Sequence, residues 1–467
     1  NAVFDRSISN NMVYFEKIPI SNTCSKFEIF DIKYINIHDS EHDLVVKNNL
    51  TENIDYRYYN SIERKQHYLV FYLVPFRISN NTLQKVSEFK IRMIQDTSLP
   101  KIKKSSIDSS VLSSGNWYKL GVTKSGVYEM DYNFLSSIGV NLDNVNPKNI
   151  RLYGNNAGML QEGDNTIDDL IEIPIDVTGE DDNVFNSDDK VLFFGQSPDT
   201  WVYEDSAFVH TKNIYSDTTY YFLCFDLGFG ARVEDYSLNY NENEINYQVS
   251  SYDNYFFHEE DLTNLVKTGR QWFGESFAFQ STQSFNSIID NLDETEDVSL
   301  SINLAARSSI GTSFNITNNS NNLTNIYIPP LSENSSDYFR TSFTHHVFQP
   351  TSADLSITLT YNNFNNTAAL AWLDYFSLSF RSNLTFNGGQ LLFRDTRSIG
   401  TGTISRFLIN SNLNNIKVWE VTNLNNINSF QLTQSNNTIS FVVETDSLRE
   451  FIVFDGTDNL IPHFSKM

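Results

Sequence analysis

The chain has only two cysteines, Cys24 and Cys224, in 467 residues. A small disulfide-bonded fold needs many cysteines in a short chain, so a disulfide framework is excluded. The two cysteines lie far apart in the sequence, which indicates that they belong to different domains. We therefore expect two buried free thiols, and one long-range disulfide is the alternative.

Positive charge and long hydrophobic runs are also scarce. The chain has 33 Lys and Arg against 57 Asp and Glu, a net charge of −24. A surface this acidic repels phosphate backbones, so we expect no nucleic-acid partner. No run approaches the roughly 18–20 apolar residues of a membrane helix, so we expect no membrane span. The first residue is Asn1, which indicates a processed or trimmed N-terminus and fits export after removal of a signal peptide.

What the chain has in abundance is alternation of apolar and polar residues with a period of two. This pattern is typical of strands with one buried and one wet face, and clusters of Asn, Gly, Ser and Asp separate the strands as turns require. The clearest segments are Lys26–Ile37, His67–Arg77, Val86–Ile94, Val298–Leu304, Ala353–Tyr361, Leu373–Phe380 and Thr438–Glu444. Helical periodicity is almost absent, and the best short helix is Asp131–Ile138, with Gly139 as its stop. The sequence predicts an all-β protein of tandem β-sandwich or jelly-roll-like domains with few short helices.

Shifts in composition predict four units along the chain. A lysine- and serine-rich stretch, Thr97–Gly115, reads as an exposed linker. A second break lies in the acidic, Asn-rich stretch near Asn241–Ser251, and a third lies near Asn383–Gly389. We expect β domains at 1–104, 105–246, 247–386 and 387–467.

No catalytic residue is expected in the chain. Cys224 lies in an aromatic run that reads as a buried strand, and Cys24 lies in a polar segment without a neighbouring base. His345 and His346 are adjacent in a predicted strand, so they point to opposite faces and are poorly placed to bind one metal. Sequence signatures of serine hydrolases, zinc proteases and phosphate-binding loops are absent.

The densest group of carboxylates is the predicted loop Glu180–Asp189. Calcium prefers several oxygen ligands from a loop of this kind, and a solvated acidic turn is the alternative. The loop lacks the glycine and the terminal glutamate of a helix–loop–helix calcium site, and Gln161–Asp169 could add ligands if it folds nearby. We expect no cofactor, with calcium as the alternative, and its candidate ligands are Asp181, Asp182, Asn183, Asn186, Asp188 and Asp189.

Four large aromatic residues in the third predicted unit are candidates for a sugar platform, because a ring face can stack on a pyranose. They are Trp272, Phe273, Trp372 and Tyr375. We favour the alternative that these rings fill the core of the domain.

Several segments carry a resemblance to a known family. Ser110–Phe134 reads SVLSSGNWYKLGVTKSGVYEMDYNF, and it is followed by Asn146–Leu160 and Phe185–Trp201. These segments resemble the N-terminal region of the sortases of the type IX secretion system, which belong to the gingipain-type cysteine peptidases of Bacteroidetes-type bacteria. Ala369–Asp395 resembles the stretch shortly before the peptidase domain of that family. The similarity covers most of the chain from about residue 105 onward.

Within these segments, several glycines and aromatic residues read as residues that determine the fold. The glycines lie where predicted strands end, which suggests that they supply backbone angles other residues avoid. They are Gly121, Gly126, Gly154 and Gly195. The aromatic residues are candidates to pack between two sheets, and they are Trp117, Tyr118, Tyr128, Tyr153 and Phe193.

The resemblance implies a cell-surface, outer-membrane-associated enzyme that cleaves C-terminal sorting signals from secreted cargo and attaches the cargo to anionic lipopolysaccharide. It implies a PorV-like outer-membrane barrel protein and PorQ- and PorZ-like attachment-complex proteins as partners. No segment matches the peptidase domain with its Cys and His, so the chain corresponds to the non-catalytic scaffold or docking region. We expect the peptidase domain to follow Met467. The alternatives are a carbohydrate-binding module that presents lipopolysaccharide and an inhibitory propeptide of a gingipain-like protease.

Overall fold

Strands are the main regular secondary structure of the chain. The computed structural model describes residues 2–4, 12–20, 24–37, 50–63, 66–79, 82–95, 109–155, 158–159, 169–204, 207–267, 269, 271–332 and 337–465. It is 52% strand and 6% helix, so the predicted all-β class is confirmed. The chain divides into two compact units, one of Asn1–Asp108 with Gln161–Asp168 and one of Ser109–Leu160 with Asp169–Met467. No helix of the described ranges is long and apolar enough to cross a membrane.

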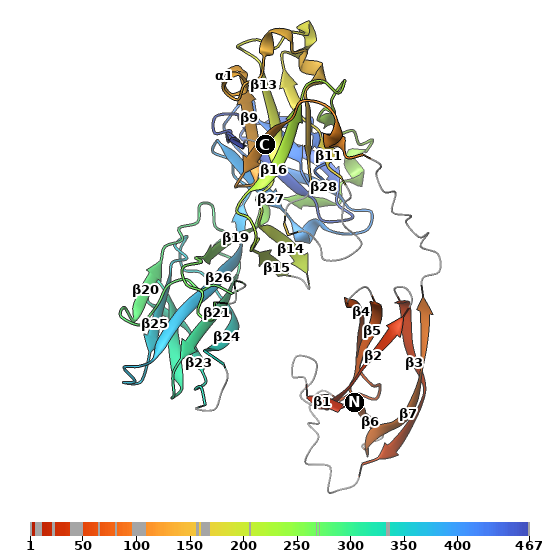
Figure 1. Cartoon of the computed structure of the whole chain (residues 1–467), viewed down its shortest axis with the longest axis vertical. Coiled ribbons are helices and arrows are strands. Elements are labelled where there is room, and N and C mark those ends of the chain that lie inside the picture. Colours follow the sequence, from red (N-terminus) through yellow and green to blue (C-terminus); the bar gives the residue numbers. More distant parts are fainter. Residues whose placement is uncertain are drawn as a thin grey trace. The chain divides into compact units, whose positions relative to one another are not determined.

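The first unit contains two antiparallel sheets (Figure 1). One sheet has the order β1-β2-β5-β4, with strands Ala2–Phe4, Met12–Ile20, Gln66–Leu73 and Tyr56–Glu63. The other has the order β3-β7-β6, with strands Cys24–Asn36, Thr82–Gln95 and Phe76–Ser79. Ile20, Phe27, Leu69 and Phe71 form a buried cluster between them, because alternate residues of each strand point inward.

The second unit begins with a sandwich that we call the first sandwich. Its larger sheet has the order β11-β10-β16-β8-β34, with strands Ile171–Ile173, Arg151–Gly154, Thr219–Cys224, Tyr118–Val122 and His463–Ser465. Its smaller sheet has the order β12-β13-β9, with strands Asp176–Thr178, Lys190–Gly195 and Gly126–Asp131. The predicted helix forms as α1 (Tyr132–Ser137), where the Asp131 side chain accepts a hydrogen bond from the backbone N–H of Phe134. Gly139 follows with φ +92°, a conformation that suits glycine at a helix end.

A second sandwich shares one of its sheets with the core of the first. The shared sheet has the order β17-β30-β29-β33-β27, with strands Glu234–Asp235, Asn428–Ser429, Lys417–Glu420, Glu450–Phe454 and Gln390–Arg394. The other sheet has the order β18-β28-β32-β31, with strands Tyr247–Val249, Ile404–Asn410, Thr438–Glu444 and Thr433–Ser435. On the shared sheet, Trp419 and Ile452 face the core of the first sandwich, while Val418 and Val453 face the core of the second. Alternate residues of β29 and β33 therefore join two cores.

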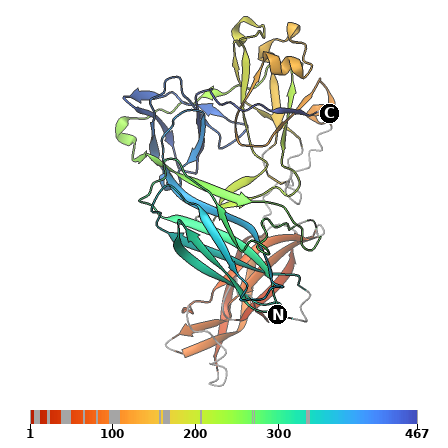
Figure 2. The ribbon, with the colours of Figure 1, turned by 90° about the vertical axis from the view of Figure 1, so that its left-hand side faces the viewer.

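The third part of this unit is a jelly roll of eight strands (Figure 2). They are β19 (Ser251–Glu259), β20 (Thr282–Phe285), β21 (Val298–Arg307), β22 (Thr312–Asn318), β23 (Asn321–Ile328), β24 (Arg340–Phe348), β25 (Ile357–Asn362) and β26 (Leu370–Asn383). The two sheets have the orders β19-β26-β21-β24 and β20-β25-β22-β23, which is the strand order of a jelly roll. Strands β18 and β27 of the second sandwich flank it in the sequence, so the jelly roll is an insertion in that sandwich.

The remaining elements of the second unit are short. A hairpin, β14 (Thr200–Glu204) and β15 (Ala207–Thr211), leaves the first sandwich after β13. The 3-10 helices are η2 (Val111–Ser113), η3 (Leu142–Asn144), η4 (Pro147–Asn149), η5 (Glu180–Asp182), η6 (Glu242–Glu244) and η7 (Thr396–Ser398).

The glycines singled out in the sequence have a different role from the predicted one. None of Gly121, Gly126, Gly154 and Gly195 has a positive φ, so the prediction that they supply unusual backbone angles is wrong. They are needed because other side chains lie against them. A Cβ on Gly154 would be 2.7 Å from the ring of Tyr221, and one on Gly195 would be 2.8 Å from the ring of Tyr128.

The aromatic residues predicted to pack between the sheets divide into two groups. Tyr128 and Phe193 are buried and stack with their ring centroids 5.4 Å apart. Tyr153 is also buried, while Trp117 packs edge-on against it at the partly exposed margin, and Tyr118 is partly buried as well. The prediction that these rings pack between the sheets is therefore confirmed for Tyr128 and Phe193. It is wrong for Tyr153, which lies on the face of β10 opposite the core residue Leu152.

Candidate functional site

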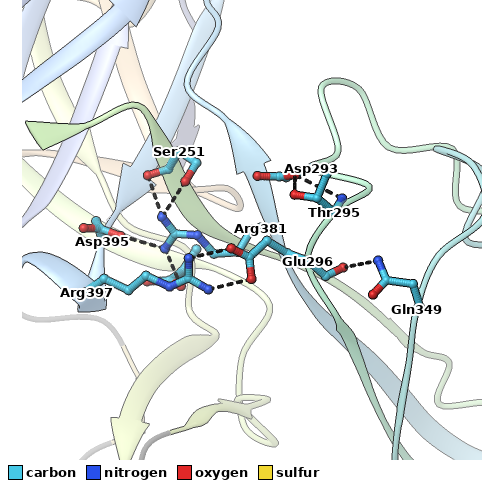
Figure 3. Close-up of polar contacts among 9 residues, drawn as sticks. Ser251, Asp293, Thr295, Glu296, Gln349, Arg381, Asp395 and Arg397 are labelled. Atoms are coloured by element: carbon cyan, nitrogen blue, oxygen red, sulfur yellow. Dashed lines mark hydrogen bonds and ion pairs between the residues drawn. The ribbon is translucent and has the colours of Figure 1, made fainter.

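The jelly roll is held to the second sandwich by a buried arginine. Nη1 of Arg381, on β26, lies 2.8 Å from Oδ1 of Asp253 on β19 and 2.6 Å from Oδ1 of Asp395 beyond β27 (Figure 3). Nη2 of Arg381 donates to the carbonyl oxygen and the hydroxyl of Ser251. The second carboxylate oxygen of Asp253 accepts from the backbone N–H of Thr396 at 2.6 Å. We call this network the junction, because it joins residues of the jelly roll to the start of η7.

At the junction, burial and the positive charge of Arg381 have opposite effects on the pKa of Asp395. Asp395 is 2% exposed, and burial raises the pKa of its carboxyl while the positive charge of Arg381 lowers it. A second pair lies beside it, in which Arg397 of η7 donates to both carboxylate oxygens of Glu296 at 2.7 and 2.8 Å (Figure 3). This pair is more exposed, and the hydrogen bonds from Arg397 lower the pKa of Glu296. Arg381 thus supplies the positive charge that compensates the carboxylates of Asp253 and Asp395.

The hairpin β14–β15 packs on the outer face of β19. The Trp201 ring lies 3.7 Å from the Tyr255 ring, and the His210 ring lies 3.5 Å from the Phe257 ring, measured between centroids. Burial lowers the pKa of His210 to about 4, so the imidazole is neutral at neutral pH. We call this element the docked hairpin, because it connects the first sandwich with the jelly roll.

A cavity of about 340 Å³ lies where the two sandwiches, the docked hairpin and the jelly roll meet. Trp201, Tyr255 and Arg394 are among its lining residues. The guanidinium carbon of Arg394 lies 3.7 Å from the centre of the Phe208 ring, and its Nη1 donates to Glu450. Nη2 of Arg394 is buried and makes no hydrogen bond within the described ranges. A molecule bound in this cavity would contact all three parts of the unit.

A second cavity, of about 310 Å³, is lined in part by Trp272, and we call it the Trp272 cavity. Trp272 is 41% exposed, whereas Phe273 and Trp372 are buried in one cluster with Ala305. Tyr375 is half-buried, with its ring 5.9 Å from the Phe257 ring. The expectation that these aromatics fill the core is confirmed for Phe273 and Trp372 and is wrong for Trp272. In the sequence, Trp372 lies in an apolar run, whereas Trp272 and Phe273 are neighbours in a largely polar segment that gives no sign of which ring is buried.

In the predicted calcium loop, most of the candidate ligands already accept hydrogen bonds from neighbouring groups of the protein. Oδ1 of Asp182 accepts from the backbone N–H of Val184, and Oδ2 of Asp189 accepts from the backbone N–H of Asn186. Oδ1 of Asn186 accepts from the backbone N–H of Asp188, and Oδ1 of Asn183 accepts from Nζ of Lys148. Asp189 is buried, while the other five candidate ligands, Asp181, Asp182, Asn183, Asn186 and Asp188, are exposed.

In the part of the chain that the structure describes, no group of three or more His, Cys, Asp or Glu side chains could hold a metal ion. Residues 161–168, which could add ligands, lie outside the described residues. Calcium binding at Glu180–Asp189 therefore stays a prediction.

We expect the loop to keep its conformation without metal, because backbone N–H groups already occupy several of its carboxylate and amide oxygens. A calcium site would instead raise the melting temperature with the logarithm of the calcium concentration above the dissociation constant. Calorimetric melting curves in calcium and in chelator test this. Coincident curves would remove the calcium prediction and leave the solvated acidic turn.

Among the cysteine and histidine side chains that the structure describes, none is arranged for nucleophilic catalysis. Cys224 is a buried free thiol, as expected, and burial raises its pKa to about 12. The thiolate needed by a nucleophile is therefore disfavoured. The side chain of Cys24 lies outside the described residues. His345 is exposed near Ser301, and His346 is partly buried, which matches the expected alternation of faces.

This chain has an all-β fold of several sandwich domains. No protein-family model and no curated protein sequence matches the chain. Among solved structures it is similar to dimeric latent PorU from Porphyromonas gingivalis, with a TM-score of 0.64 and 22% identity over 76% of this chain. The match covers 33% of the PorU chain, so this chain spans about a third of that protein. At this identity the similarity shows a shared fold.

Two other structures match with much lower scores. The insecticidal δ-endotoxin Cry8Ea1 from Bacillus thuringiensis has a TM-score of 0.19 and 11% identity, over 60% of this chain and 55% of that chain. A structure of infectious bursal disease virus, Gt strain, has a TM-score of 0.18 and 10% identity, over 98% of this chain and 83% of that chain. Neither score indicates a shared overall fold.

Proposed function

We propose that this chain is the non-catalytic scaffold and docking region of a cell-surface type IX secretion sortase. The observation that carries the proposal is the fold shared with latent PorU at a TM-score of 0.64. The sequence segments that resemble the sortase family support it, since they contain β8, β9, β10, β13, β26 and β27 of the second unit. In the proposed whole protein, a separate peptidase domain cleaves C-terminal sorting signals and attaches cargo to anionic lipopolysaccharide.

The packing of the second unit suits a scaffold. The sheet shared by two cores, the junction and the docked hairpin all restrain the three parts of the unit against one another. A rigid support of this kind would hold a peptidase domain at a fixed place beside its partners. The proposed partners are a PorV-like outer-membrane barrel protein, PorQ- and PorZ-like attachment proteins, and secreted cargo.

The experiment is performed in the bacterium that encodes the chain, with an affinity tag on the encoded protein. We expect the tagged protein to be recovered at the cell surface, cross-linked to PorV-like and PorQ- or PorZ-like proteins. Disruption of the gene should leave C-terminal sorting signals on secreted cargo. Normal cargo processing after disruption, or recovery of the protein away from the outer membrane, would contradict the proposal.

A variant separates a scaffold role from a catalytic one. Cys224→Ser should leave cargo processing unchanged, because Cys224 is a buried thiol with its pKa raised to about 12. The melting temperature of the variant is measured alongside, since a hydroxyl at a buried position lowers stability. A variant that folds normally but loses all processing would show that Cys224 is catalytic.

A further inference from the structure

The Trp272 cavity has the size and position of a small-ligand site. It holds about 310 Å³, near the lower end of volumes found for ligand pockets. Its walls come from separate segments, which are the residues after β15, the end of β19, the loop at 271–272 and β26. Its lining residues are Lys212, Asn213, Ile214, Glu259, Asp261, Gln271, Trp272 and Asp374.

The aromatic wall of this cavity is available to a ligand. Trp272 is 41% exposed, while its neighbour Phe273 is fully buried in the adjoining cluster. An indole ring left half-exposed beside a cavity offers an apolar face to a flat apolar surface, and the C–H face of a pyranose ring is such a surface. The buried position of Phe273 anchors the backbone that presents Trp272.

The polar wall consists of side chains that the fold already holds in place. Nζ of Lys212 lies 2.6 Å from Asp261 and 3.9 Å from Glu259. Oδ2 of Asp374 accepts from Nδ2 of Asn303 at 2.8 Å, and Asp374 is 9% exposed. Such restrained carboxylate, amide and ammonium groups can donate to and accept from ligand hydroxyls with little further loss of side-chain entropy.

The charges of the cavity restrict the kind of ligand. Three carboxyl groups face a single ammonium group, so an anionic ligand would be repelled. Burial raises the pKa of Glu259 to about 7, an effect that Lys212 opposes and Asp261 reinforces. Burial also raises the pKa of Asp374. The Glu259 carboxyl is therefore partly protonated at neutral pH, so it both donates and accepts hydrogen bonds, as a neutral hydroxyl ligand requires.

We propose that the Trp272 cavity binds one ring of a neutral saccharide, with Trp272 stacked on the ring and Glu259, Asp374 and Lys212 bonded to its hydroxyls. The proposal goes beyond the scaffold role, and it can hold or fail independently of that role. It also differs from presentation of anionic lipopolysaccharide, because the cavity disfavours negatively charged sugars.

The test is isothermal titration calorimetry of the whole chain with the methyl glycosides of glucose, galactose, mannose, rhamnose and N-acetylglucosamine. We expect at least one of these to bind, and methyl glucuronide, as the anionic counterpart, to show no binding. Trp272→Ala should weaken the affinity about tenfold. Trp272→Phe, which keeps an aromatic ring at this position, should retain part of the wild-type affinity. Tyr327→Ala is the matched control, since Tyr327 is exposed on β23 and does not line the cavity.

Three results would overturn the proposal. They are no binding of any of the five glycosides, equal affinity of wild type and Trp272→Ala, and binding of n-butylamine in place of the sugars. The last would make the cavity a site for cationic groups. Surface recovery of the Trp272→Ala protein in its own bacterium reports on the scaffold role separately, because that role does not depend on a bound sugar.

Discussion

Replacing Arg381 with methionine is expected to lower the free energy of unfolding by about 3–5 kcal/mol. Arg381 is 7% exposed and is paired with both Asp253 and Asp395. Methionine keeps much of the apolar stem but leaves the Asp395 carboxyl buried without its cation. Urea denaturation measures the loss. The loss should be larger at pH 8 than at pH 5, because the uncompensated carboxyl avoids its penalty by taking up a proton at lower pH.

The control for this variant is Arg397→Met in the neighbouring pair. The side chain of Arg397 is 49% exposed and that of Glu296 is 34% exposed, so this pair is screened by solvent. Its loss should cost less than about 1 kcal/mol. Equally small losses in both variants would contradict the view that buried charge at Arg381 holds the jelly roll in place.

Protonation of His210 between pH 7 and pH 4 is expected to weaken the packing of the docked hairpin. The pKa of His210 is about 4 when its ring lies on Phe257, against 6.5 when the ring is in water. The released state therefore binds more protons between these values, and docking is most stable above pH 6.5 and weakens as the pH falls towards 4. A pKa difference of this size corresponds to roughly 3 kcal/mol at most. Hydrogen exchange of residues 207–211, corrected for intrinsic rates, measures the docking.

The His210→Gln variant isolates the histidine from neighbouring charges. Asp199 and Lys212 act on His210 in opposite directions. Glu259, with its pKa raised to about 7, takes up a proton in the same pH range and opposes the effect. These groups remain in the variant, so the difference between the two proteins reports His210 alone. Exchange that depends on pH equally in both proteins would show that His210 is not responsible.

The strands were the easiest elements to predict from the sequence, because a strand with one buried face shows a local alternation of apolar and polar residues. The alternation in Val298–Leu304 and Leu373–Phe380 corresponds to β21 and β26, where alternate residues are buried. The helix at α1 was also predictable, since Asp131 and Gly139 lie at its two ends. Such features depend on neighbours within a few residues, so a single sequence contains the necessary information.

The junction and the two cavities could not be predicted from a local sequence pattern. Arg381, Asp253 and Asp395 meet because β26 pairs with β19 in a particular register, which brings Asp253 opposite Arg381. No spacing in the sequence indicates this pairing. The role of the glycines was missed for the same reason, since Gly154 is required by the ring of Tyr221, a residue distant in the sequence. Contacts of this kind depend on tertiary packing and not on local pattern.

The way in which the jelly roll is inserted has a consequence for how such a chain can vary. The chain enters it through β19 and leaves it through β26, and these two strands are paired from Ser251 with Asn383 onward. The backbone N–H of Leu384 donates to the carbonyl of Ser250 at 2.8 Å, so the two points of attachment already touch. Because its two ends meet, the jelly roll can be lengthened, exchanged for another domain or replaced by a tight turn, while the two sandwiches that share a sheet keep their connectivity. Evolution can therefore alter the jelly roll, which carries Trp272, with little effect on the folding of the two sandwiches.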